Sequence, residues 1–168
     1  IEGTSASITI ASGTYTDAAG NNGGAGSTPS ISIDTKAPTV AITSDKTALK
    51  AGQSANITFT FSETPTGFDA TDIVVTGGTL SGLTTTGLTR TATFTPTDGI
   101  EGTSASITIA SNSYTDAAGN NGGAGTTPSI SIDTKAPTVA ITSDKTALKA
   151  GQSANIRSEE HTSELQSH

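Results

Sequence analysis

The feature that most constrains this chain is an internal repeat: residues 1–57 recur as residues 100–156, an offset of 99 residues. The two copies differ only at Gly13/Asn112, Thr14/Ser113 and Ser27/Thr126. Solenoid units need only about 20–50 residues, whereas this period has the size of a small self-contained domain. We therefore expect a tandem array of domains, each with its own core, and a chain that begins and ends in mid-repeat.

The repeat divides the chain into four predicted parts. Residues 35–133 form one complete unit, residues 1–34 supply the last two strands of a preceding unit, and residues 134–156 begin a following unit. In residues 157–168 the repeat breaks, because RSEEHTSELQSH stands where the first copy continues TFTFSE. This tail resembles the translation of a sequencing-library adapter, so we expect it to be non-native. The alternative is a genuine, helix-prone terminus.

Composition argues against catalysis. The chain has no Cys, and its two histidines, His161 and His168, both lie in the tail. Ser and Thr are abundant, but a hydroxyl nucleophile needs an adjacent base to activate it. Acid–base chemistry by two carboxylates stays open in principle, yet near-identical repetition is not expected of a catalytic domain. We predict that the chain is not an enzyme.

Net charge and hydropathy limit the kinds of binding partner that this segment can have. The formal net charge is −7, which argues against nucleic acid and anionic membrane surfaces and favours cations. No run of apolar residues approaches membrane-spanning length. We expect neither nucleic-acid binding nor membrane insertion in this segment.

Alternating apolar residues bounded by Gly, Pro, Asn or Asp predict short strands in the complete unit. No segment shows a helical period over ten or more residues. About seven strands with turn signals between them predict an all-β, Ig-like antiparallel β-sandwich. The strand signals fall in residues 40–42, 55–61, 73–75, 80–88, 92–94, 105–109 and 130–132.

Tyr114 interrupts this regularity. Ile107 and Ile109 share one parity and Tyr114 has the other, so burying all three requires a bulge, which we predict near residues 111–113. Gly13 and Asn112 occupy this position in the two copies, and both residue types tolerate positive φ. Alternatively, Tyr114 leans over the edge of the sandwich.

Four segments carry a family resemblance: FTFSETPTGFDATDIVVTGGTLSGL, RTATFTPTDGIEG, YTDAAGNNG and IDTKAPTVAITSD. Together they resemble the bacterial Ig-like repeats of giant surface adhesins, over residues 1–156. The resemblance implies an extracellular stalk or spacer of a bacterial cell-surface or secreted adhesin, with neighbouring repeats as its partners. It also implies calcium at or near the joints between domains.

The carboxylates suggest where calcium would bind. Ig-like strand order places several carboxylates near the pole where the chain enters the unit. Asp34, Glu63 and Asp116 rank first as calcium ligands, and Asp72, Asp69 and Asn120 rank second. Clustered carboxylates repel one another unless a cation is present, and Ca²⁺ takes about six to eight oxygen ligands. Alternatively, these Asp and Asn residues only form turns. A matching second joint would use Asp133, Asp98 and Glu101 and should be incomplete.

The alternative function is a carbohydrate- or protein-binding Ig-like adhesive module. Sugar-binding surfaces usually present aromatic side chains, but period-two alternation places Phe59, Phe61 and Phe94 inside. Only Phe68, and at most Tyr114 with it, is expected to be exposed. A third option, ice or mineral binding, would need a flat, regular Thr face.

Overall fold

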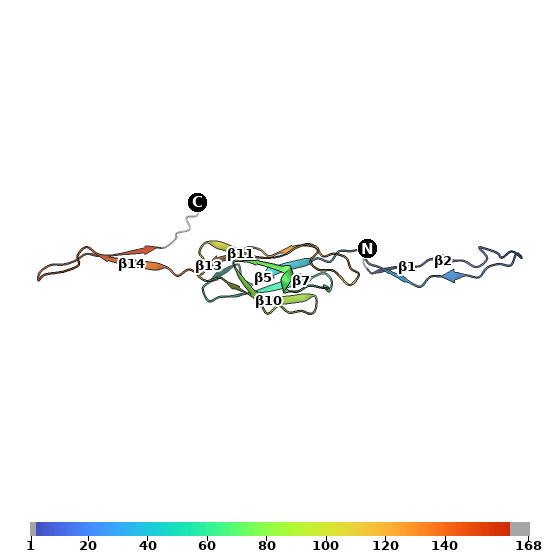
Figure 1. The fold of residues 1–168 in the computed structure, drawn as a ribbon, viewed down its shortest axis with the longest axis horizontal. Helices are drawn as coiled ribbons and strands as arrows, with labels where there is room; N and C mark the ends of the chain where they lie inside the picture. Colours follow the sequence, from blue (N-terminus) through green and yellow to red (C-terminus); the bar gives the residue numbers. More distant parts are fainter. Residues whose placement is uncertain (1–2, 162–168) are drawn as a thin grey trace.

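The three parts of the molecule follow one another along its long axis (Figure 1). A computed structural model describes residues 3–161. A leading hairpin, residues 3–33, is followed by a two-sheet sandwich within residues 35–133 and by a trailing hairpin, residues 138–161. The leading hairpin consists of β1 Thr4–Ala6, β2 Thr9–Ile10, β3 Gly26–Ser27 and β4 Ile31–Ile33. Within residues 3–161, the one helical element is the 3₁₀ turn η1, Ala70–Asp72, so the predicted all-β class is confirmed.

The sandwich has one four-stranded sheet and one sheet centred on β11. The first sheet is antiparallel in the order β5-β7-β10-β9, with bounds Val40–Ser44, Ala55–Phe61, Thr89–Pro96 and Gly78–Ser81. In the second sheet, β11 (Thr103–Ile109) pairs with β8 (Ile73–Thr76) on one side and with β12 (Gly125–Thr126) and β13 (Ile130–Asp133) on the other. Finally, β6 (Ala48–Lys50) pairs parallel to β13.

The sandwich has seven strands, the predicted number, if two strands that are each divided into two segments are counted once. The first position splits into β5 and β6, which lie in different sheets, and the last splits into β12 and β13 on one edge of β11. Sequence patterns missed β6 and β12. Leu49 is the one buried residue of β6, and β12 is two residues long, so neither offers an alternation to detect.

The hydrophobic core follows the predicted alternation. In β7, Ile57 and Phe59 are fully buried, while Asn56 and Thr60 face outward. Burial of each large apolar side chain contributes roughly 1.5–3 kcal/mol. Among the described residues, the buried hydrophobic core runs from Val40 to Ile132, and Pro38 just before it is also fully buried; all of these residues lie inside the predicted complete unit.

The expected exposure of Phe68 was wrong, and the alternative in which Tyr114 is exposed does not hold either. Phe68 is 5% exposed and Tyr114 is 2% exposed, so neither forms a surface platform. The Phe68 ring packs edge-on against Phe61 at a centroid distance of 5.0 Å and lies 6.1 Å from the Tyr114 ring. Phe68 lies in a loop, where strand alternation gives no information on burial.

The predicted bulge is present at Tyr114. Ile109 pairs with Gly125 and Thr115 with Asn121, so residues 110–114 lie opposite the shorter segment 122–124. Asn112 has a φ of 67° and is the one non-glycine residue with positive φ in the described chain. Its counterpart Gly13 has a φ of 76°. This shared positive φ explains why the position is Gly in one copy of the repeat and Asn in the other.

The trailing hairpin repeats the pairing of β5 with β7. Its strands are β14, Thr138–Ser143, and β15, Ile156–His161. Position 158 lies opposite Ile141 as Phe59 lies opposite Ile42, but position 158 is Ser. Position 160, which matches Phe61, is Glu. The tail thus keeps the strand register and lacks the apolar residues of a core strand. Its origin stays a prediction, and residues 162–168 lie outside the described residues.

None of the helical structure in residues 3–161 has the length and apolar character needed to cross a membrane.

Candidate functional site

Three carboxylates converge at the pole where the chain enters the sandwich. Asp34, Glu63 and Asp116 each offer one oxygen, and these oxygens lie within 4.8 Å of one another. Asp34 directly follows β4, Glu63 follows β7, and Asp116 follows the bulge after β11. Asp116 is 2% exposed, and the other two are half-buried. The three highest-ranked residues of the sequence prediction therefore meet in space.

Backbone and side-chain hydrogen bonds hold the three contributing segments together. Thr66 and Thr115 exchange two backbone bonds of 2.7 and 3.1 Å, which join the loop after Glu63 to the segment before Asp116. Asn120 Nδ2 donates to the carbonyl of Asp34 at 3.2 Å, which fastens the incoming linker to the same loop. Sequence reasoning missed the Thr66–Thr115 pair, because both residues lie outside the alternating strands.

The Asp116 carboxylate is fixed by its own loop. Asn120 donates to Oδ1 from its backbone nitrogen and to Oδ2 from its side chain, both at 2.8 Å. Burial acts to raise the pKa of Asp116, but hydrogen bonds from Asn120 and from the backbone of Ala118 and Gly119 outweigh it. The pKa of this carboxyl therefore lies below its usual value, and the group is ionised at neutral pH.

The leading hairpin shows what this loop does without a surrounding domain. Asp17 is the counterpart of Asp116, and it accepts the same two bonds from Asn21, at 2.9 Å each. Asp17 is exposed. The turn-forming role is therefore local to the sequence in both copies. Turn formation does not explain why Asp116, unlike Asp17, is buried beside two further carboxylates.

The convergent residues fit a hard cation. Carboxylates, carbonyls and water are the ligands that Ca²⁺ accepts, in flexible mono- or bidentate geometry. Like charges this close repel one another in a partly buried setting, and a divalent cation would offset that repulsion. Asp34, Glu63 and Asp116 are the residues that would hold it. Calcium binding itself stays a prediction.

The other two predicted ligands lie outside this cluster. Asp69 and Asp72 form a capping box around η1, in which Asp69 Oδ1 accepts from the Thr71 backbone at 2.7 Å. Asp72 Oδ2 accepts from the Asp69 backbone nitrogen at 2.8 Å. The hydrogen bonds from Thr71 lower the pKa of Asp69. The carboxylates of Asp69 and Asp72 therefore cap the start of η1.

The second joint is organised differently. Lys135 Nζ lies 2.7 Å from Glu101 Oε2, and this contact raises the pKa of Lys135. One bond is common to both joints: the backbone nitrogen of Lys135 donates to Asp133 Oδ1 at 3.3 Å, as that of Lys36 donates to Asp34 Oδ1 at 3.1 Å. The described residues do not gather Asp133, Asp98 and Glu101 into a carboxylate cluster like the first one. At this joint Glu101 pairs with the ammonium of Lys135.

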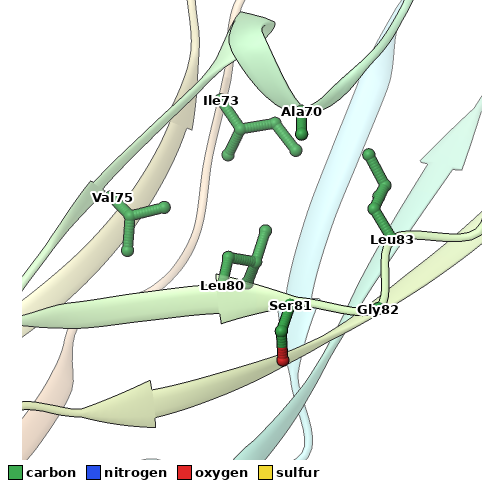
Figure 2. Close-up of a pocket in the computed structure, with 7 residues that line it drawn as sticks. All are labelled: Ala70, Ile73, Val75, Leu80, Ser81, Gly82 and Leu83. Carbon is green, nitrogen blue, oxygen red and sulfur yellow. The ribbon is translucent and has the colours of Figure 1, made fainter.

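An apolar pocket of about 220 Å³ opens between β8 and β9. Figure 2 shows Ile73, Val75, Leu80 and Leu83 pointing toward one another, while the Ser81 hydroxyl points away. A pocket that recognises a small molecule usually combines apolar walls with a few convergent polar groups. None of the side chains that line this pocket directs a polar group into it (Figure 2), so the carboxylate cluster is the stronger candidate site.

The sequence profile of one known family, described as a bacterial Ig-like domain, matches residues 34–132, more than half of the chain. Comparisons with curated proteins and with solved structures gave no significant match. The matched span includes all three clustered carboxylates.

Proposed function

The chain belongs to the bacterial Ig-like domain family, and from this premise we propose that it is a spacer segment in the stalk of a bacterial cell-surface or secreted adhesin. Domains of this family are typically non-enzymatic and typically occur at the surface or outside the cell. The observation that carries the proposal is the path of the chain. It enters the sandwich at one pole and leaves at the opposite pole, with the two hairpins in line (Figure 1).

Because the chain enters and leaves at opposite poles, repeating the unit makes the array longer. Each added unit of 99 residues extends the array instead of folding back on it. Neighbouring Ig-like repeats are then the immediate partners of each unit. The net charge of −7 keeps such arrays soluble and apart from one another.

The joint would be stiffened by calcium. In this proposal an ion held by Asp34, Glu63 and Asp116 connects the linker to two loops of the sandwich. The support is the 4.8 Å convergence of the three carboxylates and the hydrogen bond from Asn120 to the Asp34 carbonyl. Because Asp34 follows β4 directly, the ion would restrict the angle between the leading hairpin and the sandwich.

The alternative, a sugar- or protein-binding module, has less support. The four phenylalanines and Tyr114 are all buried, so the sandwich offers no aromatic platform. Tyr15 is 55% exposed, but it is the copy of a core tyrosine. The Thr face needed for ice or mineral binding exists in part, since Thr43, Thr58 and Thr91 form one cross-strand row. Sheet twist keeps such a face from being flat.

Thermal melting with calcium tests the joint. If the ion is present at about a hundred times its Kd, the linkage stabilises the fold by roughly 2.7 kcal/mol. For a domain of this size the melting temperature then rises by roughly 10–20 °C. Glu63→Gln should remove most of the rise, because Glu63 belongs to the cluster and not to its supporting turn.

Asp17→Asn is the matched control, since Asp17 occupies the same loop in the leading hairpin without converging carboxylates. It should leave the calcium response intact. A melting temperature that does not change at millimolar calcium would remove the cation from the proposal. A rise that Glu63→Gln leaves intact would place the ion elsewhere.

A further inference from the structure

The threonine that opens the exit linker, residues 134–137, is buried, although connecting segments usually run over the protein surface. Thr134 directly follows β13 and is 6% exposed. Its backbone nitrogen donates to the Ile100 carbonyl at 2.7 Å. Its hydroxyl donates to the Thr97 carbonyl at 2.7 Å and accepts from the Ile100 nitrogen at 3.0 Å. These bonds fasten the end of the last strand to the loop between β10 and β11.

A second buried threonine fastens the other end of the same strand. Thr127 lies between β12 and β13 and is 5% exposed. Its nitrogen donates to the Ile107 carbonyl at 2.9 Å, and its hydroxyl accepts from the Ile107 nitrogen at 3.0 Å. Thr28 makes the same two bonds with Ile8 in the leading hairpin, at 2.9 Å each, so the local sequence specifies this arrangement. β13 is therefore held at both ends by a threonine that exchanges bonds with an isoleucine backbone.

The strand that enters the unit and the strand that leaves it run side by side in the same direction. β6 continues the entering strand, and it pairs parallel with β13 in the register Ala48↔Ser131, Leu49↔Ile132 and Lys50↔Asp133. Ser131 N also donates to Thr47 O at 2.8 Å. Because the chain enters and leaves at opposite poles (Figure 1), a pull along the long axis drives β6 and β13 past each other in opposite directions.

Sliding of this kind loads the bonds between the strands together. Hydrogen bonds between neighbouring strands run across the strand direction, so a sliding strand strains all of its bonds at once. Peeling a strand away from its neighbour, by contrast, opens one bond at a time. β13 also pairs antiparallel with β11, and an axial pull makes it slide along that strand as well. Both neighbours of β13 therefore resist an axial pull with all their bonds together.

We propose that β13, with Thr134 at its end, is the element that carries tension through the repeat. Tension that arrives along the exit linker first meets the bonds of Thr134 and then the sliding contacts with β6 and β11. The proposal gives the spacer a mechanical role, and in that sense it rests on the proposed function. It does not involve a cation, because the carboxylate cluster lies at the entry pole, opposite Thr134.

Single-molecule pulling of the full chain in calcium-free solution tests this load path. The chain has no Cys, so an introduced pair of cysteines sets the direction of the force. Ala37→Cys with Ala136→Cys places the attachment points at exposed positions of the two linkers and pulls along the long axis. Ala37→Cys with Ala117→Cys, also exposed, pulls across the entry pole and leaves Thr134 unloaded. The axial pair should withstand a higher force than the transverse pair before the sandwich unfolds.

Thr134→Val keeps the shape of the side chain and removes the bonds of its hydroxyl. Forced unfolding reports the unfolding rate. Under a fixed axial force the variant should unfold about tenfold faster, because the lost bonds are among those that break in the rate-limiting step. Under a transverse force its rate should match that of the unaltered residue. Thr134→Ser retains the hydroxyl and should restore most of the axial resistance.

Thr127→Val is the matched control, since it removes a hydroxyl bond of the same kind at the other end of β13. It should lower stability to urea to an extent comparable with Thr134→Val. Its axial unfolding rate should nevertheless stay close to that of the unaltered residue, because tension reaches Thr127 only after β13 has detached.

Three results would overturn the proposal. One is an axial unfolding force no higher than the transverse force, a comparison that needs no change at Thr134 and so does not depend on how its variants fold. Another is an axial unfolding rate that Thr134→Val leaves unchanged. The third is an equal acceleration by Thr134→Val and Thr127→Val, which would indicate a general loss of stability. None of these results bears on the extended shape that supports the spacer proposal, so the two proposals can fail separately.

Discussion

At the scale of single residues, Arg90 shows how a charge is accommodated on the inner face of a strand. It shares its parity in β10 with Ala92 and Phe94 and is 4% exposed. Its Nη1 donates to the Phe68 carbonyl at 2.9 Å, and its guanidinium lies 5.2 Å from the centre of the Phe68 ring. Such cation–π contacts contribute about 0.5–2 kcal/mol. Arg90 thereby anchors the loop that begins after Glu63.

Asp116 allows a prediction about acid stability. Its folded-state pKa lies below the ordinary value, because the hydrogen bonds from Asn120, Ala118 and Gly119 outweigh its burial. A lowered folded pKa contributes stability above the unfolded pKa of about 3.9, and that stability is lost as the pH falls through the folded value. In calcium-free solution, the Asp116→Asn variant should therefore lose less stability than the unaltered chain when the pH is lowered below about 4. Thermal melting at each pH measures the loss.

The control for this measurement is Asp17→Asn, which changes the same loop outside the sandwich. Its melting temperature should fall with pH, from neutral to below about pH 4, in the same way as that of the unaltered chain. If Asp116→Asn lost stability with acid as steeply as the unaltered chain, Asp116 would not be one of the groups that set acid sensitivity.

Residue-level prediction succeeded where strand order alone decides position. Asp34 and Glu63 lie just beyond strand ends at one pole, and Asp116 follows the bulge after β11 at the same pole, so a correct sandwich topology brings the three together. Asp69 and Asp72 are close to that pole in sequence terms, but local capping of η1 engages them. Whether a loop carboxylate caps its own backbone or points at a neighbour depends on loop conformation, which alternation does not report.

At the scale of elements, the same sequence appears in two surroundings. β1 pairs with β4 in the leading hairpin as β11 pairs with β13 in the sandwich, although one pair is exposed and the other buried. The register is therefore the same with and without a covering sheet, as expected where the hairpin and its turn specify it, and the sandwich adds burial to it. We expect a mutation in this element to matter only where its face is covered.

Gly122 and Gly23 test that expectation. A Cβ added to Gly122 would lie 2.3 Å from the Tyr114 ring, and one added to Gly23 would lie 2.2 Å from the Tyr15 ring. Tyr114 is buried and donates a hydrogen bond to the Gly123 carbonyl at 3.1 Å, so it has nowhere to move. Gly122→Ala should lower the free energy of unfolding of the sandwich by about 1–3 kcal/mol.

Gly23→Ala should leave that free energy unchanged, because the exposed Tyr15 ring turns into solvent. Urea denaturation of the two variants provides the measurement. Equal losses of stability would mean that the leading hairpin contributes to the cooperative unit formed by the sandwich.

Prediction at the element scale depended on how many buried residues each strand contains. β7 buries Ala55, Ile57, Phe59 and Phe61 in strict alternation, and β11 buries Ala105, Ile107 and Ile109. Both were predicted from the sequence. β6 and β12 exist because neighbouring strands offer them hydrogen-bonding edges. That information is tertiary and has no trace in their own few residues.

At the scale of the whole molecule, the 99-residue period was the most informative sequence feature. It predicted a complete unit between two partial ones, and the core of the structure lies within residues 40–132. The sequence does not report where the chain enters and leaves each unit, and that placement decides whether an array extends or folds back. The structure supplies it by placing the two hairpins at opposite poles (Figure 1). The spacer proposal follows from that placement.

Small-angle X-ray scattering of the dilute chain tests the spacer role most directly. A compact protein of 168 residues has a radius of gyration of about 15 Å. An in-line arrangement predicts a radius well above that value and a distance distribution with one domain-sized peak and a long tail. A radius near the compact value, with a symmetric distribution, would show that the hairpins fold back on the sandwich and would contradict the account.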